Sequence, residues 1–380
     1  MHVFGAFHWC ETDSLTILHI RLLKIDNPDI RRRLPPVFLC DSAPVNGIDR
    51  EGVVLVGRLD SSWQEREMIG LIARGFMRSL LVLATVATIV FALIHLSGDP
   101  LAGFTPPGAS PEQQAAAREQ LGLDRSLPVQ YASFLGNALT GDFGESWRAK
   151  RPAMDVVLER LPNTIELAGL ALALAIVTGG TLGLLAARKP GGVIDAVSRF
   201  LALAGQALPA FWAGTMLILL LAVRWNLLPS SGGATWQSLI LPAITLALYP
   251  AGLIARLLRG AMIEANTADY ARTARSKGLT ESKVNVAHLL PNAVIPALGF
   301  AGIQASFLLG GAVVVESVFA YPGLGRLAMQ GVADRDIPVV QAFVIVLAAM
   351  ILIVNIVVES IAGWIDPRLR DHREVAGSAW

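Results

Sequence analysis

Asp269-Tyr270-Ala271-Arg272-Thr273-Ala274-Arg275-Ser276-Lys277-Gly278 is a charged segment that continues to Leu290-Pro291-Asn292. This charged island (residues 269–292) separates two long apolar runs. The chain of 380 residues is 53% hydrophobic and only 16% charged, whereas a soluble domain carries about 25% charged residues. The composition therefore predicts a polytopic membrane protein, and the island is a place where the chain leaves the bilayer.

Six uncharged runs are long enough to cross a membrane, which takes about 20 apolar residues in a helix. They lie at residues 79–98, 167–187, 200–223, 239–255, 293–315 and 337–358. A soluble helical core gives one such run by chance, but hardly six. The predicted fold class is all-α: a polytopic membrane protein with six transmembrane helices, so both termini face the same side.

Lysine and arginine in the connections set the predicted orientation. One set of connections carries Arg74, Arg78, Arg188, Lys189, Arg199, Arg256, Arg259, Arg272, Arg275, Lys277, Lys283, Arg368, Arg370 and Arg373. The short loops on the other side carry only Arg224, Arg326 and Arg335. The first set, the charged island and both termini are therefore predicted to be cytoplasmic. The long first loop, from Asp99 to Arg160, lies outside, and its segment Pro111–Leu121 is predicted to be a short amphipathic helix.

The N-terminal residues 1–67 have no sustained hydrophobic period and no apolar segment of signal-peptide length. We expect a disordered extension, or sequence upstream of a true start at Met68. The alternative is a small cytoplasmic regulatory domain. Residues 371–380 are expected to form a cytoplasmic tail.

Several chemistries find no support in the sequence. The net charge of +1 gives no argument for nucleic acid. Cys10 and Cys40 lack metal-ligand spacing, and no lysine follows a glycine, so the phosphate-binding P-loop is absent. We therefore expect no metal, no cofactor and no catalytic residues, and any ATP hydrolysis would take place on partner chains.

The island itself has helical spacing, which predicts a loop helix over residues 264–278. Tyr270, Ala274 and Lys277 then fall on one face, and Gly278 suits the left-handed position that ends a helix. Residues 280–283 are consistent with the start of another helix. A short helix held by flanking turns suits a protein partner better than a small ligand. The alternative is an ordinary solvated loop.

The island resembles the conserved cytoplasmic loop of bacterial ABC importer permeases, which runs Glu-Ala-Ala, three residues, Gly, nine residues, Ile, one residue, Leu-Pro. With Gly278 as anchor, Arg272-Thr273-Ala274 take the Glu-Ala-Ala positions, His288 takes the Ile position, and Leu290-Pro291 match the end. Glu264-Ala265 is out of register. The sequence from Asp269 to Gly278 resembles the same loop in the dipeptide, oligopeptide and nickel subfamily of these permeases. The resemblance is to the first (B-type) permease subunit in particular.

Other motifs of that subfamily lie along residues 68–370. They are Gly98-Asp99-Pro100, Leu121-Gly122-Leu123-Asp124, Gln130-Tyr131, Gly141-Asp142-Phe143-Gly144, Leu161-Pro162-Asn163-Thr164, Pro209-Ala210-Phe211-Trp212, Glu316 to Gly325, and Asp366-Pro367-Arg368. The resemblance implies an ABC importer transmembrane domain over 68–370. Residues 1–67 have no counterpart in the pattern.

The resemblance also implies the partners and the place of the chain. It would pair with a second permease subunit in the inner (cytoplasmic) membrane, above two ABC ATPase subunits, and receive cargo from an extracytoplasmic substrate-binding protein. Coupling to the ATPase would run through Asp269, Tyr270, Arg272, Thr273, Ala274, Lys277, Gly278, Leu290 and Pro291. Similar systems transport dipeptides, oligopeptides, glutathione or nickel complexes. We expect the cargo to be a peptide, because peptides are the most frequent cargo among such systems.

A few polar residues lie inside or beside the predicted spans, and each has either a structural role or a role in the translocation path. Gln206, Gln304 and Asn355 either bond between helices or line a translocation path. Glu166, Glu316 and Glu359 lie at span ends, where a structural role is favoured.

Two alternative classes of membrane protein would show different sequence patterns. An ion-driven secondary transporter would usually show more midplane acids and internal repeats. A membrane enzyme would need a nucleophile or metal cluster. Neither pattern is clear in the sequence.

Overall fold

The computed structural model describes residues 8–12, 15–19, 61–96, 101, 104, 110–233 and 235–365. The chain divides into two compact units, Met1–Arg78 and Ser79–Trp380. In the first unit, strands β1 (His8–Thr12) and β2 (Leu15–His19) pair antiparallel. Helix α2 (Ser61–Leu96) begins before Met68 and passes from the first unit into the second. The remainder of residues 1–67 and the predicted tail 371–380 lie outside the described residues.

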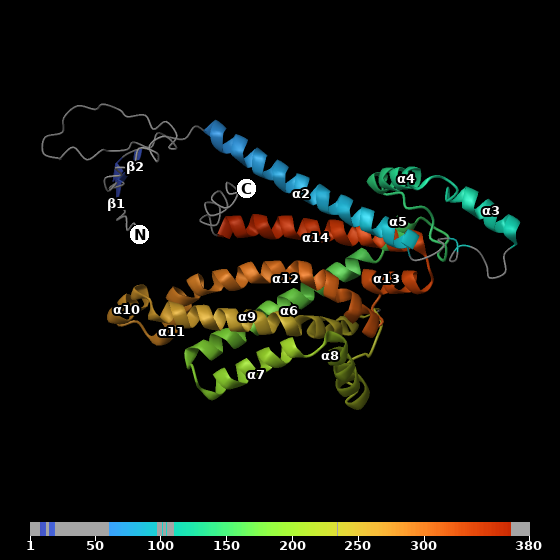
Figure 1. Cartoon of the computed structure of the whole chain (residues 1–380). Coiled ribbons are helices and arrows are strands. Elements are labelled where there is room, and N and C mark those ends of the chain that lie inside the picture. Colours follow the sequence, from blue (N-terminus) through green and yellow to red (C-terminus); the bar gives the residue numbers. More distant parts are fainter. Residues whose placement is uncertain are drawn as a thin grey trace, which may run out of the picture. The chain divides into compact units, whose positions relative to one another are not determined.

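The second unit, where the structure describes it, is built of helices, as predicted (Figure 1). After α2 come α3 (Pro111–Gln120), α4 (Leu127–Thr140), α5 (Ala153–Leu158), α6 (Leu161–Arg188), α7 (Val193–Ala207), α8 (Ala210–Leu217), the π-helix η2 (Ile218–Arg224), the 3-10 helix η3 (Trp236–Leu239), α9 (Ile240–Thr267), α10 (Asp269–Ser276), α11 (Glu281–Lys283), the π-helix η4 (Val284–Leu289), α12 (Leu290–Val318), α13 (Leu324–Ala333) and α14 (Ile337–Ile365).

Helix α9 is the centre of this unit. It packs against α6, α7, α8 and α12, and 72% of its most apolar stretch is buried, against 28–33% for the other long apolar helices. Glycines bring α6 and α9 together: a Cβ on Gly179 would lie 2.5 Å from the carbonyl oxygen of Ala251, and one on Gly183 would lie 2.7 Å from that of Ala255. Gly179 therefore packs closely against α9, whereas Gly180 faces open space.

Four helical runs of the described residues are long and apolar enough to cross a membrane: Ala153–Arg188, Trp236–Thr267, Glu281–Val318 and Ile337–Val358. They contain four of the six predicted spans. The first predicted span corresponds to the shorter apolar segment Leu80–Leu96 of α2. The count of six spans stays a prediction.

The predicted single span 200–223 is not one straight helix. α7 and the run Ala210–Arg224 meet at a bend of 109°. Leu208 has extended backbone at ψ 125° and Pro209 follows at ψ 137°, because a residue before proline is disfavoured in the helical region. The helix also starts at Val193, seven residues before the predicted limit. Counting uncharged residues gives the length of an apolar run but not its direction.

A buried carboxylate ties together two of the sequence motifs. Glu316 on α12 is fully buried. It accepts hydrogen bonds from the Thr164 hydroxyl at 2.6 Å and from the backbone N–H of Gly325 at 2.6 Å and of Arg326 at 3.2 Å. A Cβ on Gly323 would collide with this carboxylate. The predicted structural role of Glu316 is thus supported by its contacts.

The loop between α2 and α6 is anchored in a similar way. Asp336, before α14, is 3% exposed and accepts from the Ser146 hydroxyl at 2.6 Å and from the backbone N–H of Trp147 at 3.2 Å and of Arg148 at 3.3 Å. The predicted helix Pro111–Leu121 is present as α3, and Ser110 and Gln113 close a reciprocal capping box at its start. This anchoring holds the Ser146–Arg148 turn against the start of α14.

Candidate coupling site

The charged island forms a separate short helix after a break in the chain. α9 continues past Arg256 to Thr267, and Ala268 then takes an extended backbone conformation at φ −70° and ψ 155°. α10 follows from Asp269 to Ser276. The loop helix predicted over 264–278 is therefore two pieces, because residues up to Thr267 belong to the end of α9. Asp269 in the first turn complements the positive end of the helix dipole.

The end of α10 matches the sequence prediction. Gly278 has φ +76°, the left-handed region in which glycine is favoured. Its N–H donates to the carbonyl of Arg275 at 2.9 Å, and a Cβ there would meet no atom within 4 Å. The requirement for glycine at this position is therefore one of backbone conformation and not of space. The chain then continues into α11, as residues 280–283 indicated.

Two alanines form the inner face of α10. Ala271 is fully buried and Ala274 is 6% exposed, and α10 packs against α9 and η4. Val284 and Leu289 of η4 are both fully buried. Small side chains on one helix and branched side chains on the other let the two segments approach closely, so the backbone of α10 is held by apolar contact on one side.

The outer face of α10 is polar and exposed. Tyr270 is 42% exposed, and the side chains of Asp269 and Arg272 are 99% and 76% exposed in a weak pair at 3.8 Å. Thr273 and Lys277 are exposed as well. Of the predicted face of Tyr270, Ala274 and Lys277, only Ala274 is buried, because α9 and η4 cover that side of the helix, while Tyr270 and Lys277 are exposed at its edge.

Arg275 fastens both ends of α10 to their neighbours. Its guanidinium donates through Nε to Oε1 of Glu281 at 2.8 Å and to both the carbonyl and the side-chain oxygen of Asn266. Glu281 raises the pKa of Arg275, first through this hydrogen bond. Sequence reasoning did not select Arg275 as a site residue. The signal that was available is a basic and an acidic residue on either side of the turn at Gly278.

Leu290 and Pro291 do not start a new span after a loop. Residues Glu281–Val318 form one continuous helical run, in which Leu290 is half-buried and Pro291 exposed. The π-helical turn η4 precedes Pro291. A proline has no N–H to donate to the preceding turn, and π-turns inside helices often mark functional positions. The island and the long helix α12 are thus joined directly.

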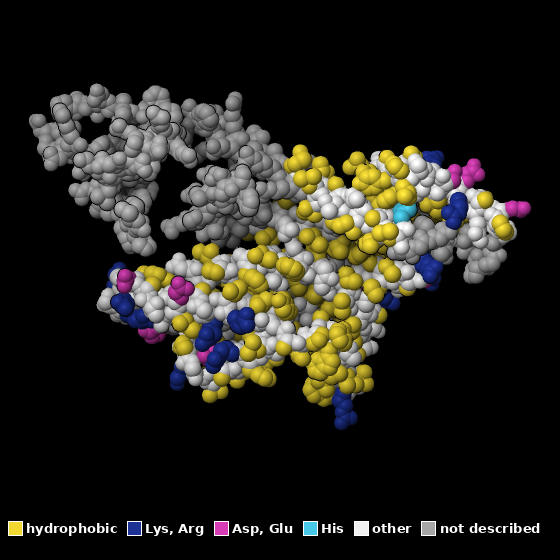
Figure 2. Space-filling view, viewed as in Figure 1, with side chains coloured by type: hydrophobic (Ala, Val, Ile, Leu, Met, Phe, Trp, Pro, Cys, Tyr) yellow, Lys and Arg dark blue, Asp and Glu magenta, His cyan; other side chains and the backbone are white. Residues whose placement is uncertain are grey.

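The surface around α10 and α11 mixes both signs of charge. Figure 2 shows Lys, Arg, Asp and Glu side chains gathered at this end of the second unit, while hydrophobic side chains cover much of the neighbouring helices. A further pair lies close by in the fold: Asp195 at the start of α7 is 1% exposed and holds the guanidinium of Arg259 on α9 at 2.6 and 3.0 Å. This pair joins the start of α7 to α9.

The three predicted path residues are not brought together. Gln206 on α7 donates to the carbonyl of Ala202 in its own helix at 2.8 Å and lies against Gly252 of α9. Gln304 on α12 is 6% exposed. Asn355 on α14 accepts from the Ser306 hydroxyl of α12 at 2.6 Å, which is the predicted kind of bond between helices. Among the described residues, no group of three or more His, Cys, Asp or Glu is arranged to hold a metal ion.

Comparisons with known proteins give the family. Residues 179–371 match the family model described as binding-protein-dependent transport system inner membrane component, and residues 68–168 match the model for the N-terminal part of such components. The dipeptide transport system permease protein DppB of Escherichia coli K12 is 37% identical over 323 residues, which cover 76% of this chain and 95% of that protein.

Two further proteins are similar. The glutathione transport system permease protein GsiC of Escherichia coli K12 is 36% identical over 304 residues, covering 80% of this chain and 99% of that protein. A structure of the MetNI methionine ABC transporter in an inward-facing conformation is 18% identical, with a TM-score of 0.48, over 56% of this chain and 96% of that chain. On the family match and the two permease relatives, the chain belongs to the family of inner membrane components of binding-protein-dependent transport systems.

Proposed function

We propose that this chain is a translocation subunit of an ATP-driven peptide importer and that α10 is the surface on which an ATPase subunit acts. The observation that carries the proposal is the construction of α10: an exposed polar face on a helix whose other face is buried and whose ends are clamped. A helix fixed in this way transmits a push without deforming, which a solvated loop does not.

The outer face supplies the contacts of the proposed docking surface. Asp269, Tyr270, Arg272, Thr273 and Lys277 are exposed. Of these, tyrosine and arginine are residue types enriched at protein interfaces. Ala271 and Ala274 hold the helix from behind. Gly278 and the run through Leu290 and Pro291 join the surface to α12. An ATPase that contacts α10 differently in its open and closed states therefore biases the helices between two arrangements.

The partners and the orientation follow from the same proposal. No lysine of the sequence follows a glycine, so the P-loop that binds ATP belongs on other chains. We place α10 and both termini in the cytoplasm on the bias of lysine and arginine in the connections. The chain pairs with a second permease subunit above two ATPase subunits, and an extracytoplasmic binding protein delivers the cargo. We place the permeation unit within residues 68–370, and the family models that match residues 68–168 and 179–371 support this placement.

The proposed cargo is a dipeptide or oligopeptide. The relatives at 36–37% identity are named as dipeptide and glutathione transport permeases, and glutathione is itself a small peptide. Gln304 and Asn355 remain candidates for the path, with Gln206, whose bond within its own helix and contact with Gly252 give it a packing role as well.

Cross-linking tests the docking surface. With Cys10 and Cys40 replaced by serine, Tyr270→Cys is expected to cross-link to the ATPase subunit in membranes that hold the assembled importer. Glu119→Cys on α3 is the control, because α3 belongs to the loop placed outside. Cross-linking from Glu119→Cys and none from Tyr270→Cys would refute both the docking surface and the orientation.

A transport assay tests whether the chain takes part in ATP-driven peptide uptake through α10. Proteoliposomes that contain the whole importer and its binding protein should accumulate a labelled dipeptide only with ATP. Ala274→Glu, which places a carboxylate on the buried face of α10, should abolish that uptake while the chain still inserts. Normal ATP-driven uptake by this variant would contradict the proposal.

A further inference from the structure

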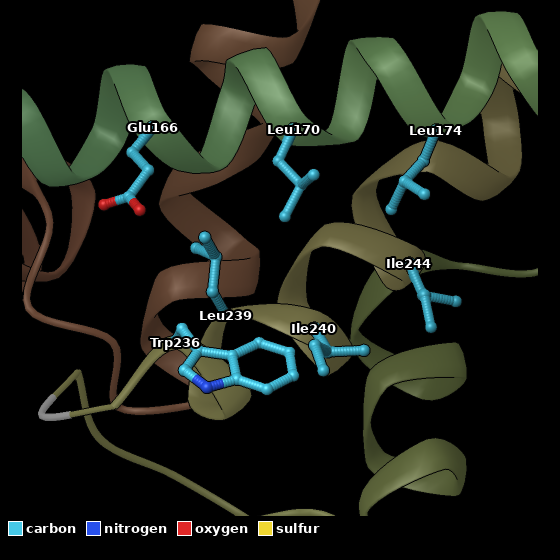
Figure 3. Close-up of a pocket in the computed structure, with 7 residues that line it drawn as sticks. All are labelled: Glu166, Leu170, Leu174, Trp236, Leu239, Ile240 and Ile244. Atoms are coloured by element: carbon cyan, nitrogen blue, oxygen red, sulfur yellow. The ribbon is translucent and has the colours of Figure 1, made fainter.

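A cavity of about 480 Å³ opens between α6 and the start of α9. Glu166, Leu170 and Leu174 project into it from one face of α6, at spacings of four residues (Figure 3). Trp236 and Leu239 of η3 and two isoleucines of α9 form the opposite wall. The walls are thus apolar, with one ionisable group and one indole ring. Binding sites for small molecules have volumes of roughly 300–1,000 Å³ and this kind of lining.

Glu166 differs from the neighbouring buried carboxylate. Glu316 is enclosed and accepts three hydrogen bonds. Glu166 is exposed to the cavity and makes no hydrogen bond or ion pair with any residue that the structure describes. The sequence favoured a structural role for Glu166, but no structural partner accounts for it. An ionisable residue within a membrane-spanning helix is a candidate functional residue.

No described residue forms an ion pair with Glu166, and its nearby charged and titratable groups are Glu316 and the Tyr321 hydroxyl. Burial, followed by the negative charges of Glu166 and Glu316, raises the pKa of the nearby Tyr321 hydroxyl to about 12. Tyr321 is therefore an uncharged phenol at neutral pH. A negative charge beside apolar walls favours a ligand that brings one positive charge and an apolar body. The Trp236 ring adds a face to which ammonium groups are attracted.

We propose that this cavity is a cargo subsite in which Glu166 binds the amino-terminal ammonium of a peptide and the aliphatic walls bind its first apolar side chain. The inference rests on the proposed function, since it takes the cargo to be a peptide. The carboxylate end of the peptide would point away, because Glu166 repels it. Trp236 closes the subsite at the end opposite α6.

Titration of a matched pair of probes tests the subsite. The assembled importer in nanodiscs is titrated calorimetrically with leucyl-leucinamide, which carries one ammonium and no carboxylate, and with its N-acetyl derivative, which carries no charge. The amide should bind at least about tenfold more tightly than the acetylated probe, because a charge-assisted hydrogen bond is lost on acetylation. Glu166→Gln should remove that preference, and Glu119→Gln on α3, an exposed carboxylate outside the cavity, should keep it.

A second variant separates loss of the charge from loss of the fold. Ile244→Trp keeps Glu166 and fills the cavity, so it should weaken binding of both probes. Equal binding of the two probes, undiminished preference in Glu166→Gln, or no binding to the wild-type complex overturns the subsite. Peptide uptake by the wild type is measured separately: a complex that binds the amide through Glu166 but transports no peptide contradicts the proposed function alone.

Discussion

Thr164 on α6 donates its hydroxyl proton to Oε1 of Glu316 on α12 at 2.6 Å, across 152 positions of the sequence. The same hydroxyl oxygen accepts the backbone N–H of Leu324 at 2.8 Å. Its neighbour Asn163 donates to the carbonyl of Pro322 at 2.7 Å. Two distant motifs therefore form one buried anchor that fixes the start of α6 to the turn between α12 and α13.

Replacing the hydroxyl should weaken this anchor. Thr164→Val keeps the shape of the side chain but leaves the N–H of Leu324 and one bond of Glu316 unsatisfied, so we expect the free energy of unfolding to fall by about 1–3 kcal/mol. Thr178→Val is the control on the same helix, because the Thr178 hydroxyl is exposed and, among the described residues, bonds only to the carbonyl of Leu174. Denaturation of the purified variants in detergent measures both. Equal effects at the two positions would argue against the anchor.

Glycine packing between α6 and α9 gives a second matched pair. A methyl group on Gly179 would lie 2.5 Å from the Ala251 carbonyl, whereas one on Gly180 meets nothing within 4 Å. Gly179→Ala should force the helices apart and lower stability by about 1–3 kcal/mol. Gly180→Ala should be neutral or slightly stabilising, since alanine has the higher helix propensity. Thermal unfolding distinguishes them, and comparable melting temperatures would contradict the close approach.

The sequence predicted the existence of most long helices better than their ends and directions. Charged residues set the predicted limits, so the span 239–255 stopped before Arg256, whereas α9 runs to Thr267, since a charge ends an apolar run but does not end a helix. The angle of the bend at Leu208 and Pro209 depends on packing against the neighbouring helices, which the sequence alone does not reveal. The end of the helix at Gly278 was predicted correctly, because a backbone position with positive φ favours glycine. The inner face of α10 was not predicted, because it is determined by the packing of η4 and α9 against the helix.

The conformation of Gly278 gives a third prediction. Alanine at φ +76° costs about 1–2 kcal/mol of local strain, so Gly278→Ala should reduce ATP-driven uptake moderately. Gly278→Pro should abolish it, because proline cannot adopt a positive φ and loses the N–H bonded to Arg275. Gly260→Ala on α9 has open space around its Cβ and should transport normally. Uptake is measured at equal amounts of membrane-inserted protein. Full activity in Gly278→Pro would show that the shape of this turn does not matter.

Arg275 gives the last prediction, because it joins the end of α9 to the start of α11 across α10. Arg275→Gln removes the planar fork and should uncouple the motion of α10 from its neighbours, so that ATP hydrolysed per peptide imported rises by about tenfold while the ATPase remains bound. Arg275→Lys should restore little, since a lysine cannot reproduce the two-sided fork.

The Glu281 contact of Arg275 can be tested on its own by charge reversal. Glu281→Arg alone should uncouple transport, and the double variant Arg275→Glu with Glu281→Arg should recover part of the coupling because the pair is restored with reversed sign. The recovery will be partial, since the bonds to Asn266 need a guanidinium at position 275. The interaction energy of this double-mutant cycle isolates the pair from the rest of the turn. Additive effects of the two changes would mean that the contact between Arg275 and Glu281 carries no coupling, which would leave the bonds to Asn266 and the buried alanines to hold α10.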